Sequence, residues 1–131
     1  MSTGHEDSAA LRAHLDHVHA EQAGFTETCA TACRDAEGRD SYTWLAQALN
    51  ARDGGAMLDL ACGSGVLLER LAAERFLTRL TGVDMSAPEL ALAATRLAGT
   101  GVELRQGTAQ DLSFLGGGSA RALCRHRRRA A

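Results

Sequence analysis

Lysine is absent from this 131-residue chain, so all 14 of its basic residues are arginine. The absence excludes a P-loop with its lysine, a Schiff-base lysine and any cofactor held by a lysine side chain. Long apolar runs are also missing, since none approaches the ~18 residues that span a bilayer, and the chain does not begin like a secretory signal. We therefore expect a soluble, cytoplasmic protein with no membrane partner.

Cysteine is sparse, and a chain without a secretory signal is expected to meet a reducing cytosol that keeps thiols reduced. We expect four free thiols, at Cys29, Cys33, Cys62 and Cys124. A zinc site stays open as an alternative, because two pairs of ligand types recur at helical spacing: His14 with His17, and Cys29 with Cys33. Partly exposed helix residues explain both pairs equally well, so we assign no metal.

The charge is divided unevenly along the chain. The net charge is −2, yet residues 1–114 carry nine arginines against 16 acids, a net charge of −7, and the segment from Leu115 onward adds five arginines and no acid. An acidic body argues against a nucleic-acid partner, which binds basic surfaces. A tail that binds nucleic acid or a protein partner stays open as an interpretation of the arginine-rich end, although this end has no aromatic ring for base stacking.

Length and 45% hydrophobic content indicate one domain. Apolar residues at helical spacing predict a helical lead-in over residues 1–55, with helices at 6–22, 27–36 and 40–51. The third helix is expected to place Trp44, Leu45, Ala48 and Leu49 on one side. The pattern then alternates between strands, predicted at 56–61, 78–83 and 102–106, and the helices between them. The first of these helices is predicted at 65–75. The second is expected to begin after Ser86, which caps it together with Glu89 in a capping box. Alternation of this kind predicts a parallel α/β sheet.

The most informative stretch is an apolar strand that ends in an acid, Asp59, and runs into a loop of small residues opening a helix. Glycines at 63 and 65 have no Cβ, so the backbone can turn sharply and approach a ligand, and the following helix directs free N–H groups at it. Nineteen residues after Gly65, Asp84 ends the next strand, where an acid can accept both hydroxyls of a ribose. The spacing suits a cofactor that contains adenosine.

Two rival motifs fail at single positions. The dinucleotide fingerprint G-x-G-x-x-G requires glycine where the chain has Leu68, and the nucleophile elbow G-x-S-x-G does not fit the residues before Ser64. Cys62 in the loop is read as a buried packing residue rather than a nucleophile.

Three segments in order resemble motifs of class I S-adenosylmethionine-dependent methyltransferases. LDLACGSG is similar to motif I, TGVDMS resembles motif II, and VELRQGTAQDLSF resembles the stretch that follows, so the likeness covers residues 56–114. It implies a Rossmann-like three-layer half-domain, an S-adenosyl-L-methionine cofactor and methyl transfer as the activity. It also implies cofactor-binding roles for Asp59, Ala61, Gly63, Ser64, Gly65, Asp84, Met85, Thr108 and Ala109.

Within this resemblance, Asp59 would help hold the amino group of the methionine moiety, and the loop from Ala61 to Gly65 would line its approach. Asp84 would bind the ribose hydroxyls, Met85 would pack on the adenine, and Thr108 with Ala109 would meet the adenine edge. Two positions depart from the family pattern: Ala61 stands where a glycine is usual, and Thr108 stands where an acid is common.

The segment 115–131 departs from the family. Residues 119–124 have the position of a fourth strand, but Arg121 interrupts it and RHRRRAA follows where a catalytic loop is expected. We read this Gly- and Arg-rich end as a truncated or frameshifted product, and we expect the chain alone to be inactive. The acceptor stays unidentified, with a small molecule favoured, and no catalytic residue is assigned. The alternative is a non-catalytic fragment that binds the cofactor or another protein.

Overall fold

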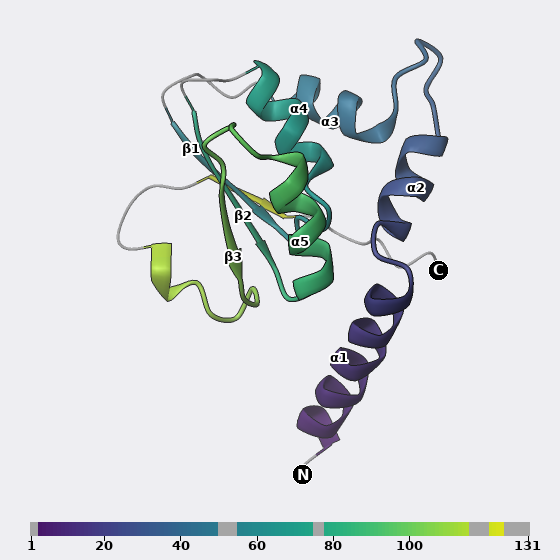
Figure 1. The fold of residues 1–131 in the computed structure, drawn as a ribbon, viewed down its shortest axis with the longest axis vertical. Helices are drawn as coiled ribbons and strands as arrows, with labels where there is room; N and C mark the ends of the chain where they lie inside the picture. Colours follow the sequence, from purple (N-terminus) through teal and green to yellow (C-terminus); the bar gives the residue numbers. More distant parts are fainter. Residues whose placement is uncertain (1–2, 50–54, 75–77, 116–120, 125–131) are drawn as a thin grey trace.

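The centre of the fold is a four-stranded parallel sheet (Figure 1). A computed structural model describes residues 3–49, 55–74, 78–115 and 121–124. The strands are β1 (Ala56–Leu60), β2 (Arg79–Asp84), β3 (Glu103–Gln106) and β4 (Arg121–Cys124), and they lie in the order β3-β2-β1-β4. This confirms the predicted Rossmann-like half-domain and includes the fourth strand, which pairs with β1 despite its arginine.

All three strand pairs are parallel, so the carboxyl ends of β1, β2 and β3 lie at the same edge of the sheet. Leu60 pairs with Val83, and Asp84 pairs with Gln106. In such sheets ligands bind outside the carboxyl ends of the strands. The register therefore brings the two loops that carry the sequence motifs together.

Two crossover helices, α4 (Val66–Glu74) and α5 (Ala87–Arg96), connect these strands and supply one covering layer of the predicted three-layer arrangement. The α4 leucines at 67, 68 and 71 are completely buried. Gly82 of β2 allows this close packing, because a Cβ there would lie 2.6 Å from Cδ1 of Leu68. α4 thus packs so closely on the sheet that a side chain at position 82 would force Leu68 to shift.

The lead-in consists of α1 (Thr3–Glu21), α2 (Phe25–Ala32) and α3 (Ser41–Ala48), and α1 projects away from the sheet (Figure 1). The second helix ends earlier than predicted, because a bridge between Arg34 and Asp40 closes the chain into a loop. Within that loop the Asp35 carboxylate accepts hydrogen bonds from the backbone N–H groups of Glu37 and Arg39. These bonds compete with a further helical turn.

The apolar side predicted for the third helix packs on the core only in part. Tyr42 and Ala46 are the buried residues of α3, Leu45 and Leu49 pack at the edge of the core, and Trp44 is 51% exposed. The core therefore uses the side of α3 next to the predicted one.

The capping box predicted for α5 is present only in half. The Ser86 hydroxyl accepts a bond from the Glu89 backbone N–H, as expected for an N-cap. The Glu89 carboxylate does not return to the Ser86 backbone N–H, which instead donates to Asp84 Oδ1 at 2.8 Å. Glu89 accepts a bond from the backbone N–H of Gly24 at 2.7 Å. The acid reaches the lead-in rather than its own helix.

Membrane-spanning helices, metal-binding clusters and cysteines were also searched for among the residues that the structure describes. No helix there has the length and apolar character to cross a membrane. The described part of the chain holds no cluster of three or more side chains suited to binding a metal ion. Cys29 and Cys33 are exposed thiols, and Cys62 is buried in the hydrophobic core, as predicted for a packing residue. The Cys124 side chain lies outside the described part of the chain, as do residues 116–120 and 125–131 of the predicted tail at 115–131.

Candidate cofactor site

Backbone hydrogen bonds join the loops at the carboxyl ends of the first three strands. The Cys62 N–H, just after β1, donates to the Val83 carbonyl oxygen at 3.0 Å, and the Gly107 N–H, just after β3, donates to the Asp84 carbonyl oxygen at 3.0 Å. The side-chain amide of Gln106 donates to the Met85 carbonyl oxygen at 3.2 Å. The three loops are thus fixed relative to one another.

The loop after β1 turns through three residues with left-handed backbone, Ala61 (φ 58°), Gly63 (φ 55°) and Gly65 (φ 83°). Ala61 is the exception among them, because an L-residue with a Cβ is strained in that region. At Gly65 the missing side chain serves packing as well: a Cβ there would lie 3.1 Å from Ala93 Cβ of α5 and 3.0 Å from Cδ1 of Leu97, the residue after α5. The second glycine is therefore needed for α5, in addition to any approach of a ligand.

Asp84 is the buried acid at the centre of the site, with only 6% of its surface exposed. Its Oδ2 accepts a hydrogen bond from the Gly63 N–H at 2.9 Å, and its Oδ1 accepts one from the Ser86 N–H at 2.8 Å. A carboxylate oxygen has two lone pairs, so each oxygen keeps capacity for one more donor. The acid both holds the glycine loop and can still bind hydroxyl groups.

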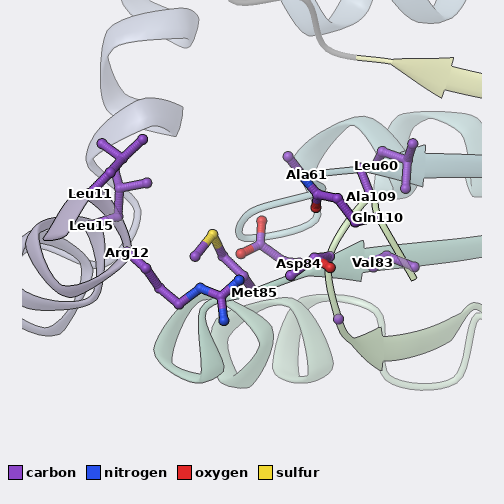
Figure 2. A pocket seen from close by; sticks show the side chains of 12 residues that line it. Leu11, Arg12, Leu15, Leu60, Ala61, Val83, Asp84, Met85, Ala109 and Gln110 are labelled. Atoms are coloured by element: carbon purple, nitrogen blue, oxygen red, sulfur yellow. The ribbon is translucent and has the colours of Figure 1, made fainter. Parts of the chain in front are cut away.

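A cavity of about 370 Å³ opens beside Asp84 (Figure 2). Five of the predicted cofactor residues line it: Ala61, Asp84, Met85, Thr108 and Ala109. Its other lining residues are Leu60 of β1, Val83 of β2, Gly107 and Gln110 after β3, and Leu11, Arg12 and Leu15 of α1. Figure 2 shows Met85 between Asp84 and the α1 side chains. The volume falls within the range of ligand pockets, ~300–1,000 Å³.

Four predicted residues do not line this cavity. Asp59 is completely buried inside β1, while Gly63, Ser64 and Gly65 form the loop beside the cavity. The Ser64 hydroxyl is engaged elsewhere, since it donates to Glu27 Oε2 at 2.6 Å. The binding roles of these four residues stay predictions.

Sequence reasoning missed the contribution of α1 and of Gln110. Gln110 directly follows two predicted residues, so the signal for it was present in the third motif. The α1 residues lie some fifty positions before motif I, and their helical pattern gives no indication of what they face. Only the fold brings Leu11, Arg12 and Leu15 to the site.

Comparison with known proteins places this arrangement in a family. A family model described as "Methyltransferase domain" matches residues 57–127, more than half of the chain. No curated protein sequence gives a significant match.

Solved structures with a similar arrangement include a SAM-dependent methyltransferase from Geobacter sulfurreducens in complex with S-adenosyl-L-homocysteine, with 32% identity and a TM-score of 0.46 over 56% of this chain and 30% of that one. YjhP from E. coli has 31% identity and a TM-score of 0.45 over 50% of this chain and 28% of that one. A SAM-dependent methyltransferase from Thiobacillus denitrificans has 28% identity and a TM-score of 0.46 over 56% and 30% of the two chains. This chain spans less than a third of the length of these structures.

The family match begins in β1, continues through the glycine loop and the strand that ends in Asp84, and extends past β4. It therefore covers the parallel sheet and every sheet residue that lines the cavity. The chain belongs to the class I S-adenosylmethionine-dependent methyltransferase family.

Proposed function

We propose that the cavity beside Asp84 binds S-adenosylmethionine and that the protein acts in methyl transfer. The observation that carries the proposal is the buried Asp84 carboxylate, which is fixed by two backbone N–H groups at the cavity wall and keeps an acceptor site on each oxygen. Such a group matches the two adjacent hydroxyls of a ribose.

The residues around Asp84 fit the rest of an adenosine. Met85 offers a polarisable thioether to the adenine ring, and Thr108 with Ala109 offers a hydroxyl and a small side chain at the base edge. The adjoining loop of Gly63, Ser64 and Gly65, with Asp59 beneath it, is proposed to accommodate the methionine moiety. When bound, the cofactor supplies a methyl group activated by its sulfonium, and the protein's part is to hold and orient it.

We propose a small molecule as the acceptor. The acidic charge of residues 1–114 disfavours a nucleic-acid acceptor. The α1 side chains Leu11 and Leu15 add apolar surface to the cavity wall, and Arg12 adds a cation. Part of the acceptor site is expected to come from beyond the described residues.

The first prediction concerns Asp84. Isothermal titration should show that S-adenosylhomocysteine binds the chain better than NAD or ATP, and that Asp84→Asn weakens its binding roughly tenfold or more. Charge-assisted hydrogen bonds are worth about 1.5–3 kcal/mol each, and the variant loses the charge that two ribose hydroxyls would face.

Asp16→Asn is the matched control, because it removes the same charge from an exposed position on α1. Thermal melts should accompany the titrations, since Asp84 also holds the glycine loop. Equal affinity of the wild type and a folded Asp84→Asn variant for S-adenosylhomocysteine would reject the assignment.

A further inference from the structure

A cluster of polar contacts ties α2 to the glycine loop. The Glu27 carboxylate accepts the Ser64 hydroxyl at 2.6 Å, and Arg96 Nη2 of α5 lies 2.8 Å from each of its two oxygens. Arg96 Nε in turn donates to the Ser64 carbonyl oxygen at 3.0 Å. Ser64 is thus held through its side chain and its backbone by the same ion pair.

Burial makes this cluster stronger than a surface ion pair. The side chains of Glu27 and Arg96 are 26% and 27% exposed, and Ser64 is 4% exposed. Hydrogen bonds that involve a charged partner are shorter and about twice as strong as neutral ones, and partial burial reduces their screening by water. Glu69 of α4 lies farther away, 3.6 Å from Arg96 Nη1, so Glu27 is the closer partner of the arginine.

The cluster acts from outside the cavity. Neither Glu27, Ser64 nor Arg96 lines it, so none of the three has a place in direct contact with an adenosine there. Ser64 stands between Gly63 and Gly65, whose left-handed backbones define the turn. Fixing Ser64 from its far side therefore fixes the path of the loop that faces the cavity.

A second contact ties the same corner of the lead-in to the same region. Glu89 of α5 is 5% exposed and accepts a bond from the Gly24 backbone N–H, at the residue before α2. Its Oε2 also lies 3.5 Å from the place where a Cβ of Gly63 would stand. The turn between α1 and α2 is thus anchored at both the start of α5 and the glycine loop.

We infer that Glu27 is a positioning residue that, through Ser64 and Arg96, holds the glycine loop in its binding conformation. The inference rests on the proposed function for the identity of the ligand. Glycines lose more conformational freedom on ordering than any other residue, and a loop ordered in advance does not lose it again when the ligand binds. The lead-in thereby raises cofactor affinity without touching the cofactor.

The test compares Glu27→Gln and Ser64→Ala with Glu74→Gln, which removes one charge from an exposed position at the end of α4. We expect Glu27→Gln to weaken S-adenosylhomocysteine binding three- to tenfold by isothermal titration, measured well below the melting temperature of each variant. Glu74→Gln should bind like the wild type. Ser64→Ala should weaken binding by a smaller factor. In the double variant, the further loss of affinity caused by Glu27→Gln should be smaller than the loss it causes in the wild type.

The readout that separates positioning from stability is amide hydrogen exchange of the ligand-free chain. Faster exchange confined to residues 61–65 is expected in Glu27→Gln, with exchange in β1 and β2 unchanged. A lower melting temperature with unchanged affinity and unchanged loop exchange would overturn the inference. If Glu27→Gln does not fold, Ser64→Ala supplies the same two measurements, and wild-type binding and loop exchange in that variant would also overturn it.

Failure of the proposed function gives a different result. A wild type that does not bind S-adenosylhomocysteine would reject the cofactor assignment, while the exchange measurement would still decide whether Glu27 orders the loop. Unchanged exchange in that case overturns the positioning role as well.

Discussion

At the scale of single residues, the glycine loop carries one side chain in a conformation that suits glycine better. Ala61 has φ 58° and sits at the cavity wall, where the family pattern has glycine. For an L-residue this region costs about 1–2 kcal/mol, whereas glycine adopts it freely at an entropic cost of about 0.5–1 kcal/mol on folding. The loop therefore keeps a strained residue at its first position.

Ala61→Gly is predicted to stabilise the chain. The strain that the substitution relieves exceeds the entropy that it adds to the unfolded state by about 0.5–1 kcal/mol. Urea unfolding should therefore give Ala61→Gly a higher midpoint with an unchanged slope. Ala91→Gly, at an exposed site in the middle of α5, is the control and should cost about 0.5–1 kcal/mol. A loss of stability in Ala61→Gly equal to that of the control would show that Ala61 is not strained.

At the scale of helices and strands, α3 is held at its start by a buried acid. Asp40 is 4% exposed, and its carboxylate accepts the Thr43 backbone N–H at 2.8 Å. It also lies 3.6 Å from Arg70 of α4, so the cap joins the lead-in to the sheet layer. The hydrogen bond from Thr43, followed by the nearby charge of Arg70, holds the pKa of Asp40 below its usual range despite its burial.

This lowered pKa predicts a pH-dependent contribution to stability. A carboxyl group whose pKa is lower in the folded state stabilises the fold above its ordinary pKa of about 3.9, and the contribution is lost as pH falls through the lower folded value. Asp40→Asn keeps a capping side chain but loses the charge at the helix N-terminus, so it should cost about 0.3–1 kcal/mol near pH 7. Thermal or urea unfolding of both proteins between pH 7 and pH 2 measures the difference.

The difference between wild type and Asp40→Asn is expected to shrink below about pH 4. Other acids with lowered pKa values, Asp35 and Asp111, are present in both proteins and cancel in the comparison. Asp16→Asn serves again as the control, with no such trend. A difference that stays constant down to pH 2 would contradict the role assigned to the Asp40 charge.

The elements that sequence could predict are those fixed by local pattern. Buried parallel strands are mostly apolar, as β1 is apart from Asp59, and a loop rich in small residues marks where this strand ends, so β1 was predicted correctly. The end of α2 was not predicted correctly, because it depends on the bridge between Arg34 and Asp40. The exposure of Trp44 was also missed, since apolar residues lie on two sides of α3 and only packing selects one.

The residues of the site also differ in how far apart in the sequence their partners lie. Asp84 and Met85 follow directly from a short motif, whereas Glu27 meets Ser64 across 37 positions and Arg96 across 69. No spacing rule connects residues so far apart, and an acid near the start of a short helix is ordinarily a solvent-exposed group. Contacts of this kind emerge only because the fold places α2 beside the glycine loop and α5.

At the scale of the whole molecule, we propose that the described cavity forms the cofactor side of a methyl-transfer site. It offers binding groups for an adenosine, and its charged lining residues are Arg12 and Asp84. Holding an acceptor in line with the methyl group can supply about 7–11 kcal/mol of the barrier, and that contribution needs walls on both reactants.

We therefore predict that the 131-residue chain binds the cofactor without turnover. A tritiated methyl-transfer assay against pooled small-molecule, protein and RNA acceptors should give no incorporation above that of Asp84→Ala, under conditions where titration shows the wild type to be saturated. Incorporation above that level would show that these residues complete the acceptor site, and the labelled pool would identify the acceptor class.

The strand order has a consequence for how the chain reaches its folded state. β1 lies between β2, which follows it closely in sequence, and β4, whose Arg121 pairs with Met57 across 64 positions. Pairings between distant segments form slowly, because the intervening chain must be ordered first. During synthesis at about 5–20 residues per second, one side of β1 stays open for several seconds after β2 has emerged. An apolar strand with an open edge is a template for pairing with other chains, so the last strand to arrive also ends the period of greatest risk of aggregation.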